Sequence, residues 1–235
     1  MSAFPGWLQL LSVVYLAASA ASAVVVLVDI VVGNHRQSMW IMDVVWPVTA
    51  LWSGPFGLYA YHRWGRAAEK RSVMRARQEH RPPPNRAQPF AVLAGKGATH
   101  CGSGCTLGDI IAELLILAVP FSIFGRNIFG AWAYDFVLAF AMGIAFQYFT
   151  IKPMRNLSVR DGLREALKAD ALSLVAWQLG MYGWMALATF VLLHHELSKA
   201  SPVFWFMMQV AMFFGFLTSY PVNWFLIKRG VKEAM

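Results

Sequence analysis

The chain has 235 residues, of which 58% are hydrophobic and only 14% charged, and its formal net charge at pH 7 is +8. A soluble domain carries about a quarter charged residues, whereas several runs here reach the ~20 apolar residues of a membrane-spanning helix. The composition therefore excludes an ordinary soluble domain. It predicts an integral, multi-pass membrane protein of the all-α class.

Hydropathy and helix-ending residues predict a six-helix transmembrane bundle. The predicted spans are Leu8–Val32, Trp40–Tyr61, a third that begins within Cys101–Gly108 and ends at Phe124, Phe129–Ile151, Ala171–Leu193 and Phe204–Ile227. The first has no basic region before it and is long for a signal-peptide core, so we interpret it as a true span. Residues 1–61 then form a first hairpin, residues 62–96 a cytoplasmic linker and residues 97–235 a four-helix region.

Two connections have a recognisable character. The linker 62–96 is basic and rich in proline, which predicts a short helical extension of the second span followed by a disordered or lipid-attached loop. Ahead of the fifth span, Ser158 and Asp161 fit a capping box. They predict a cytoplasmic helix that runs into that span.

Spans two, four and six share a layout in which a tryptophan opens the span and a basic residue follows 23 positions later. The tryptophans are Trp40, Trp132 and Trp205, and the basic residues are Arg63, Arg155 and Lys228. One interpretation is a bundle of three pseudo-repeated helical hairpins. The other is that any span running from outside to inside places tryptophan at one interface and a cation at the other.

Basic residues predict the orientation. Of the 20 lysines and arginines, 17 lie in the 62–100 loop, the 152–170 loop and the C-terminal tail. The other three are Arg36, Arg126 and Lys199, one in each remaining connection. The positive-inside rule then makes both termini cytoplasmic, as in a bacterial inner membrane. This bias explains the positive net charge without a nucleic-acid partner, and it predicts that anionic lipid binds at the cytoplasmic face. Further partners that the sequence allows are a second copy of the chain, in a homo-oligomer, and a partner metalloprotein.

The run GATHCGSGCTLGDI, residues 97–110, holds both cysteines of the chain. In a helix that begins near Cys101, the residues Cys101, Cys105, Asp109 and Glu113 follow one another at i, i+4 steps and share one face. His100 lies off that stripe, but the glycines leave the backbone free to bring it round. Cytoplasmic thiols stay reduced, and thiolate with imidazole suits zinc or copper(I). We therefore predict a transition-metal site formed by His100, Cys101, Cys105, Asp109 and Glu113.

Methionines near the bundle would suit copper(I) further: Met181, Met185, Met207, Met208 and Met212. The alternative interpretation of the run is packing. Gly102, Gly104 and Gly108 would then make a close helix crossing, with the cysteines as small apolar fillers.

A second set of ionisable residues lies near the predicted outer ends of the spans: Asp29, His35, Asp43 and Asp135. Acids inside a membrane are expensive and are functional hypotheses by default, so these residues are candidates for an outer gate. A structural role, in which the acids pair with Arg36 or Arg126 or cap helices, competes with that interpretation.

Several stretches resemble an uncharacterised family of polytopic membrane proteins that is classed as a domain of unknown function. They are MWIMDVVWPVTALWSGPF, GATHCGSGCTLGDI, GMYGWMAL and SYPVNWFLIKRGVKEAM. The resemblance implies a membrane fold and assigns no catalytic residues. A loose association of such proteins with copper-related genes favours a metal.

The leading functional hypothesis is handling of a transition metal, most plausibly copper(I), by a transporter or a membrane metal-binding protein. In this hypothesis the thiols and His100 take the ion, and Asp109 and Glu113 carry it, or coupling protons, deeper. A membrane metalloenzyme or oxidoreductase, and a scaffold or assembly subunit without a site, are the alternatives. A transporter requires acids toward both faces joined by a polar path, and an enzyme requires one closed cluster.

Overall fold

The computed structural model describes residues 4–193 and 197–233, and throughout these residues the regular structure is helical. Five helical segments are long and apolar enough to cross a membrane: Gly6–Val31, Phe90–Ala118, Asn127–Arg155, Val159–Leu192 and Pro202–Lys228. The all-α, multi-pass prediction is therefore confirmed. The second predicted span, Trp40–Tyr61, is absent from this set.

The first helix, α1 (Gly6–Val31), has no charged residue before Asp29 and leaves many valines and leucines exposed on its surface. Its buried side is instead lined by serines. Ser12 and Ser22 each donate a hydrogen bond to the carbonyl four residues earlier. These bonds satisfy the hydroxyls where no water is available, so the helix can turn small polar side chains inward and apolar ones toward lipid.

The predicted second span folds back on itself. Helix α2 (Met42–Ser53) ends at Gly54, whose φ of 59° and ψ of −135° turn the chain into α3 (Pro55–Ala60), the π-helical turn η1 (Tyr61–Gly65) and the 3-10 turn η2 (Arg66–Ala68). The two ends of this hairpin meet, because the Ser38 N–H donates to the Ala68 carbonyl and the Lys70 N–H to that of Arg36, both at 2.8 Å. Residues 40–61 therefore form a helical hairpin whose two ends lie together, called the re-entrant hairpin below.

Side chains from other helices satisfy the backbone at the tip of this hairpin. Tyr15 donates to the Ser53 carbonyl at 3.1 Å, and the Gln209 amide donates to the Leu51 carbonyl at 2.7 Å. Irregular backbone at membrane depth is tolerated where protein surrounds it and supplies such partners. The hairpin meets that condition.

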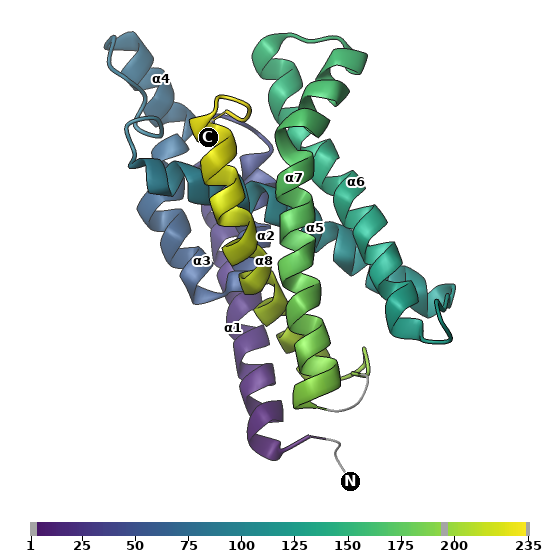
Figure 1. The fold of residues 1–235 in the computed structure, drawn as a ribbon. Helices are drawn as coiled ribbons and strands as arrows, with labels where there is room; N and C mark the ends of the chain where they lie inside the picture. Colours follow the sequence, from purple (N-terminus) through teal and green to yellow (C-terminus); the bar gives the residue numbers. More distant parts are fainter. Residues whose placement is uncertain (1–3, 194–196, 234–235) are drawn as a thin grey trace.

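The re-entrant hairpin changes two expectations. The start of α1 and the end of α8 (Pro202–Lys228) lie at opposite ends of the bundle (Figure 1), which differs from the six-span arrangement, and the cytoplasmic placement of both termini stays a prediction. The repeat of three hairpins is not confirmed either. Trp40 packs against Phe149, near the end of α6 (Asn127–Arg155), at 5.6 Å between ring centroids, whereas Trp132 lies near the start of that helix.

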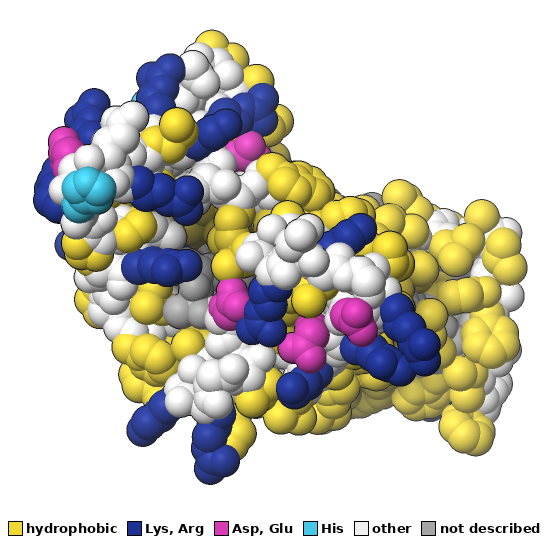
Figure 2. All heavy atoms as spheres, turned by 90° about the horizontal axis from the view of Figure 1, so that it is seen from above, with side chains coloured by type: hydrophobic (Ala, Val, Ile, Leu, Met, Phe, Trp, Pro, Cys, Tyr) yellow, Lys and Arg dark blue, Asp and Glu magenta, His cyan; other side chains and the backbone are white. Residues whose placement is uncertain are grey.

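Beyond the hairpin, the basic linker is partly helical. Helix α4 (Lys70–Gln78) follows η2, and the next helix, α5 (Phe90–Ala118), begins well before the predicted start within 101–108. The glycine-rich run is thus fully helical. Lysines and arginines of α4, the α6–α7 connection and the segment after α8 gather on one end of the bundle (Figure 2), called the basic face below.

Glycines allow α5 to cross α6 at very short range. A Cβ atom on Gly104 would lie 2.6 Å from the Cα of Gly143, and one on Gly108 would lie 2.4 Å from the Cα of Ala139. The ring of Trp177 fills the space beside Gly102 in the same way. The predicted close helix crossing is therefore present at Gly104 and Gly108.

Helix α7 (Val159–Ala186) continues into the π-helical turn η3 (Leu187–Leu192). The predicted cap at its start is confirmed, because the Asp161 N–H donates to the Ser158 hydroxyl at 3.2 Å. Helices α6, α7 and α8 pack around the buried face of α5 (Figure 1). This face is where the polar residues lie.

Candidate functional site

Helix α5 carries a column of buried polar side chains along one face: Cys101, Cys105, Asp109 and Glu113, each at most 4% exposed. The α-helical rise over these twelve residues is about 18 Å, so the four side chains occupy successive levels of the bundle. Among the residues that the structure describes, no three His, Cys, Asp or Glu side chains converge as ligands of one metal ion. The four side chains of the column therefore lie at different heights along α5.

Cys101, at the basic-face end of the column, lies against a buried ion pair. The Lys232 ammonium is 2.5 Å from an Asp170 carboxylate oxygen and 2.9 Å from the Cys101 sulfur, and both charged side chains are fully buried. Lys232 thus occupies the place that the sequence-based prediction gave to a metal ion. Neither Lys232 nor Asp170 was among the predicted site residues.

His100 takes no part in that cluster. Its ring packs edge-on against Phe146 of α6, and its Nε2 atom forms a hydrogen bond with the Thr150 hydroxyl at 3.0 Å. The helical backbone explains this placement, because consecutive residues of a helix point about 100° apart. The glycines do not unwind to bring the imidazole round to the thiols.

Two buried carboxyl groups lie near each other inside the bundle. Asp109 of α5 is 1% exposed, and neither of its carboxyl oxygens has a hydrogen-bond partner among the described residues. Asp135 of α6 is equally buried and close enough to interact with it electrostatically. From α7, the Gln178 amide faces Asp109, and Tyr182, which donates to the Trp132 carbonyl, lies near both acids.

Asp109 also borders a cavity of about 210 Å³ between α1, α2, α5 and α8. The wall is mostly apolar, with Thr106 and Gln209 as further polar groups. Two thioethers, Met208 and Met212, line the same cavity. Asp109 therefore lies beside a cavity that has two soft sulfur atoms in its wall.

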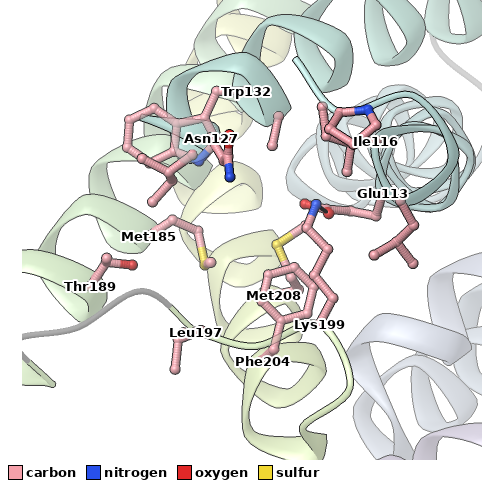
Figure 3. A pocket seen from close by; sticks show the side chains of 14 residues that line it. Glu113, Ile116, Asn127, Trp132, Met185, Thr189, Leu197, Lys199, Phe204 and Met208 are labelled. Atoms are coloured by element: carbon pink, nitrogen blue, oxygen red, sulfur yellow. Dashed lines mark hydrogen bonds and ion pairs between the residues drawn. The ribbon is translucent and has the colours of Figure 1, made fainter. Parts of the chain in front are cut away.

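At the far end of the column, Glu113 pairs with Lys199 of the α7–α8 connection. They point toward each other at a cavity of about 260 Å³, whose wall includes Met185 and Met208 (Figure 3). Burial lowers the pKa of Lys199 to about 8. Its ammonium can therefore give up its proton under mildly alkaline conditions.

The predicted outer gate does not assemble. Asp29 binds the Tyr61 hydroxyl at 2.6 Å and lies 3.6 Å from Arg66, whose guanidinium also contacts His35 at 3.0 Å. These contacts tie the end of α1 to the end of the hairpin, at the basic face. Asp29 and His35 therefore belong to a network at the ends of the hairpin, and their assignment to an outer gate stays a prediction.

Asp43 pairs with Arg36 at 3.3 Å and accepts a hydrogen bond from the Gln37 N–H at 2.8 Å, so the predicted structural alternative holds for it. Asp135, the fourth member of the predicted gate, lies apart from the others in the bundle centre beside Asp109. The structure therefore moves one residue of the set into the column and leaves three in a structural network.

The model of a family described as a domain of unknown function (DUF4396) matches residues 92–232. The match covers more than half of the chain, which therefore belongs to this family, and it includes the whole α5 column together with Asp170 and Lys232. No curated protein and no solved structure matches the chain. The re-entrant hairpin lies outside the matched region.

Proposed function

We propose that this member of the DUF4396 family is a membrane transporter that carries a soft cation, most plausibly copper(I), along the α5 column in exchange for protons. The observation that carries the proposal is Asp109. It is buried within a helix long and apolar enough to cross a membrane, no charged group neutralises its carboxyl group among the described contacts, and it belongs to the wall of a cavity.

The free-energy cost of a buried carboxylate favours a mobile positive charge beside Asp109. An ionised carboxylate in an apolar interior without a partner is costly, so it is held either as the neutral acid or beside a cation. Asp135 next to Asp109 increases that cost, because two adjacent carboxylates repel each other. A proton and a cation are therefore alternative occupants of the pair, which is the basis of an exchange mechanism.

The sulfur atoms favour a soft ion as the cargo. Cys105 lies one helical turn from Asp109 on the same face, Met208 and Met212 line the cavity beside Asp109, and Met185 joins Met208 at the cavity beside Glu113. Thioethers and thiols select copper(I) over hard cations such as magnesium. Thioether sulfur atoms therefore accompany both carboxylate levels of the column, Asp109 and Glu113.

Ion pairs close both ends of the column. Asp170–Lys232 lies toward the basic face, and Glu113–Lys199 lies toward the other face. A conformation with both pairs formed would hold the centre isolated from both sides, as alternating access requires. The alternatives fit less well. An enzyme with a resident metal requires converging ligands, and the described residues provide no such group.

Reconstituted protein tests the proposal. With an outward or inward pH gradient imposed on proteoliposomes, we expect the wild type to take up copper(I), or silver(I) as its stable analogue, faster than empty vesicles do. Asp109→Asn preserves shape but cannot exchange a proton, and we expect it to lower gradient-driven uptake at least ten-fold. Glu79→Gln, a change in the exposed linker, is the matched control and should transport normally.

Two outcomes would overturn the proposal. One is full gradient-driven transport by Asp109→Asn in vesicles that contain equal amounts of monodisperse protein. The other is a wild type that moves neither ion. A metal that co-purifies with the wild type and cannot be exchanged would instead favour the metalloenzyme alternative.

A further inference from the structure

The Lys232 ammonium sits in a cage of four electron-pair donors. Besides Asp170 Oδ1 and Cys101 Sγ, the Asn223 side-chain oxygen lies 2.7 Å from Nζ and the Gly97 carbonyl oxygen lies 3.2 Å from it. The donors come from α5, α7 and α8, so the cage joins the three helices around one positive charge. Its donor set of three oxygens and one sulfur is that of a cation site.

The cage is held by bonds that do not involve Lys232. The Asn223 amide nitrogen donates to the Ser219 carbonyl at 3.0 Å and to the Ser219 hydroxyl at 2.9 Å, which turns the Asn223 oxygen toward the cage. The Cys101 sulfur lies 3.1 Å from both the Gly97 carbonyl and Asp170 Oδ1. The donors therefore keep their orientation without the ammonium.

One acceptor in the cage is unused. Asp170 is fully buried, and its second oxygen, Oδ2, has no hydrogen-bond partner among the described residues. Almost all buried polar atoms of native proteins are paired. An ammonium that leaves a carboxylate oxygen unpaired fits the site incompletely, and a coordinated ion could use that oxygen.

Lys232 reaches the cage from a short segment, residues 229–233, that leaves α8 through Gly230 with a φ of 68°. The Val231 and Lys232 N–H groups both donate to the Leu226 carbonyl, at 3.0 and 3.3 Å. Glu233 pairs with Arg155 on the surface at 2.7 Å. Apart from Lys232 itself, these anchors are a helix-end turn and a half-exposed ion pair, so the segment can detach without unfolding the bundle.

We propose that this cage is the binding site for a soft monovalent cation at the basic face, and that Lys232 is a tethered cation which occupies it until a free one arrives. The proposal rests on the proposed function for the identity of the ion. Charge favours a monovalent ligand, because the cage carries one carboxylate and now holds one ammonium, and the thiol favours copper(I) or silver(I). When the ion binds, Lys232 leaves as the protonated ammonium and the Cys101 thiol gives its proton to the Asp170 carboxylate, 3.1 Å away, so the sulfur binds as thiolate and the charge of the site is unchanged.

Silver(I) binding to purified full-length protein tests this site. Lys232→Ala empties the cage, and we expect it to bind silver(I) at least ten-fold more tightly than the wild type. The gain should disappear in Lys232→Ala/Cys101→Ser and in Lys232→Ala/Asp170→Asn. Arg229→Ala, in the same segment but exposed, is the matched control and should bind as the wild type does. Lys232→Leu, which fills part of the volume and offers no donor atom to silver(I), replaces the alanine variant if that variant fails to fold.

The wild type gives an independent measurement. If silver(I) displaces Lys232, saturating silver(I) should increase the rate of tryptic cleavage after Arg229 several-fold, and Cys101→Ser should abolish the increase. Unchanged affinity in Lys232→Ala together with unchanged cleavage in the wild type would overturn the proposal. The two proposals can fail separately. If Lys232→Ala binds silver(I) more tightly but Asp109→Asn transports normally, the cation site at Lys232 is supported and the transport mechanism through Asp109 is rejected.

Discussion

At the scale of single residues, the feature that organises the site is a lysine with no exposed surface. Burying an ammonium costs several kcal/mol unless a partner of opposite charge and further hydrogen bonds offset the loss of water. Lys232 has both: Asp170 is the partner of opposite charge, and three neutral groups accept hydrogen bonds from its ammonium. Each member of the ion pair is therefore stable only in the presence of the other.

This dependence predicts an asymmetry between single and double substitutions. Lys232→Met or Asp170→Asn alone should destabilise the detergent-solubilised protein by about 3–5 kcal/mol, because each leaves one buried charge without its partner. The double variant should recover a large part of that loss. Thermal unfolding of the four proteins measures it, and equal effects for single and double variants would show that the two charges act independently.

The sequence predicted half of this site. Cys101, Cys105, Asp109 and Glu113 were identified from their four-residue spacing, a local signal that survives in the structure. Their partners were not, since Asp170 and Lys232 are separated from Cys101 by 69 and 131 positions. Local periodicity carries no information about which distant helix supplies a counter-charge. A lysine shortly after an apolar helix is also what the positive-inside rule alone leads one to expect.

At the scale of helices, the contact between α5 and α6 depends on the absence of side chains. A leucine at Gly104 would have to displace the backbone of α6, because even its Cβ would lie 2.6 Å from Gly143 Cα. We expect Gly104→Leu to lower the apparent melting temperature in detergent well beyond the effect of Leu115→Ala, which removes a partly exposed side chain of the same helix. Overpacking of this kind costs about 1–3 kcal/mol or more. Equal melting temperatures would mean that the crossing is loose.

The re-entrant hairpin depends on one glycine in the same way. Gly54 has a positive φ that L side chains rarely adopt, and an added Cβ would lie 2.9 Å from the Ser19 hydroxyl. Gly54→Ala should therefore destabilise the protein by about 1–3 kcal/mol. Gly183→Ala, at a helical position with nothing within 4 Å, should be neutral or slightly stabilising. The comparison fails if both variants melt at the temperature of the wild type.

Hydropathy could not separate this hairpin from a span, because both need about 20 apolar residues. The distinguishing signal was the Gly54–Pro55 step in the middle of the run, where a left-handed glycine precedes a proline that starts a new helix. Pro47, by contrast, lies inside α2 without ending it. Which proline breaks a helix is decided by the neighbouring helices that satisfy the freed carbonyls, and here Tyr15 and Gln209 do so at the tip.

At the scale of the whole molecule, the hairpin increases the difference in the number of basic residues between the two ends of the bundle. The orientation was predicted from that difference. Arg36, one of three exceptions in the six-span arrangement, lies at the basic face, because its carbonyl pairs with Lys70 of the linker. Of the lysines and arginines, Arg126 and Lys199 lie in the two connections at the other end (Figure 1). By the positive-inside rule we expect the basic face to be cytoplasmic, with Lys232 on the cytoplasmic side of the column.

Labelling from the two sides of the membrane distinguishes the five-span from the six-span arrangement. The three positions Ser38, Glu79 and Ala200 are exposed, and both native cysteines are fully buried, so single cysteines can be introduced one at a time without removing Cys101 or Cys105. We expect Ser38→Cys and Glu79→Cys to react with a membrane-impermeant maleimide from the same side, because backbone hydrogen bonds join residues 36–38 to 68–70. Ala200→Cys should react from the opposite side.

In a six-span bundle Ser38→Cys would instead react together with Ala200→Cys, because a full crossing between residues 40 and 61 separates residue 38 from residue 79. That result would mean that the hairpin crosses the membrane, and it would return α1 to an orientation with its first residues in the cytoplasm.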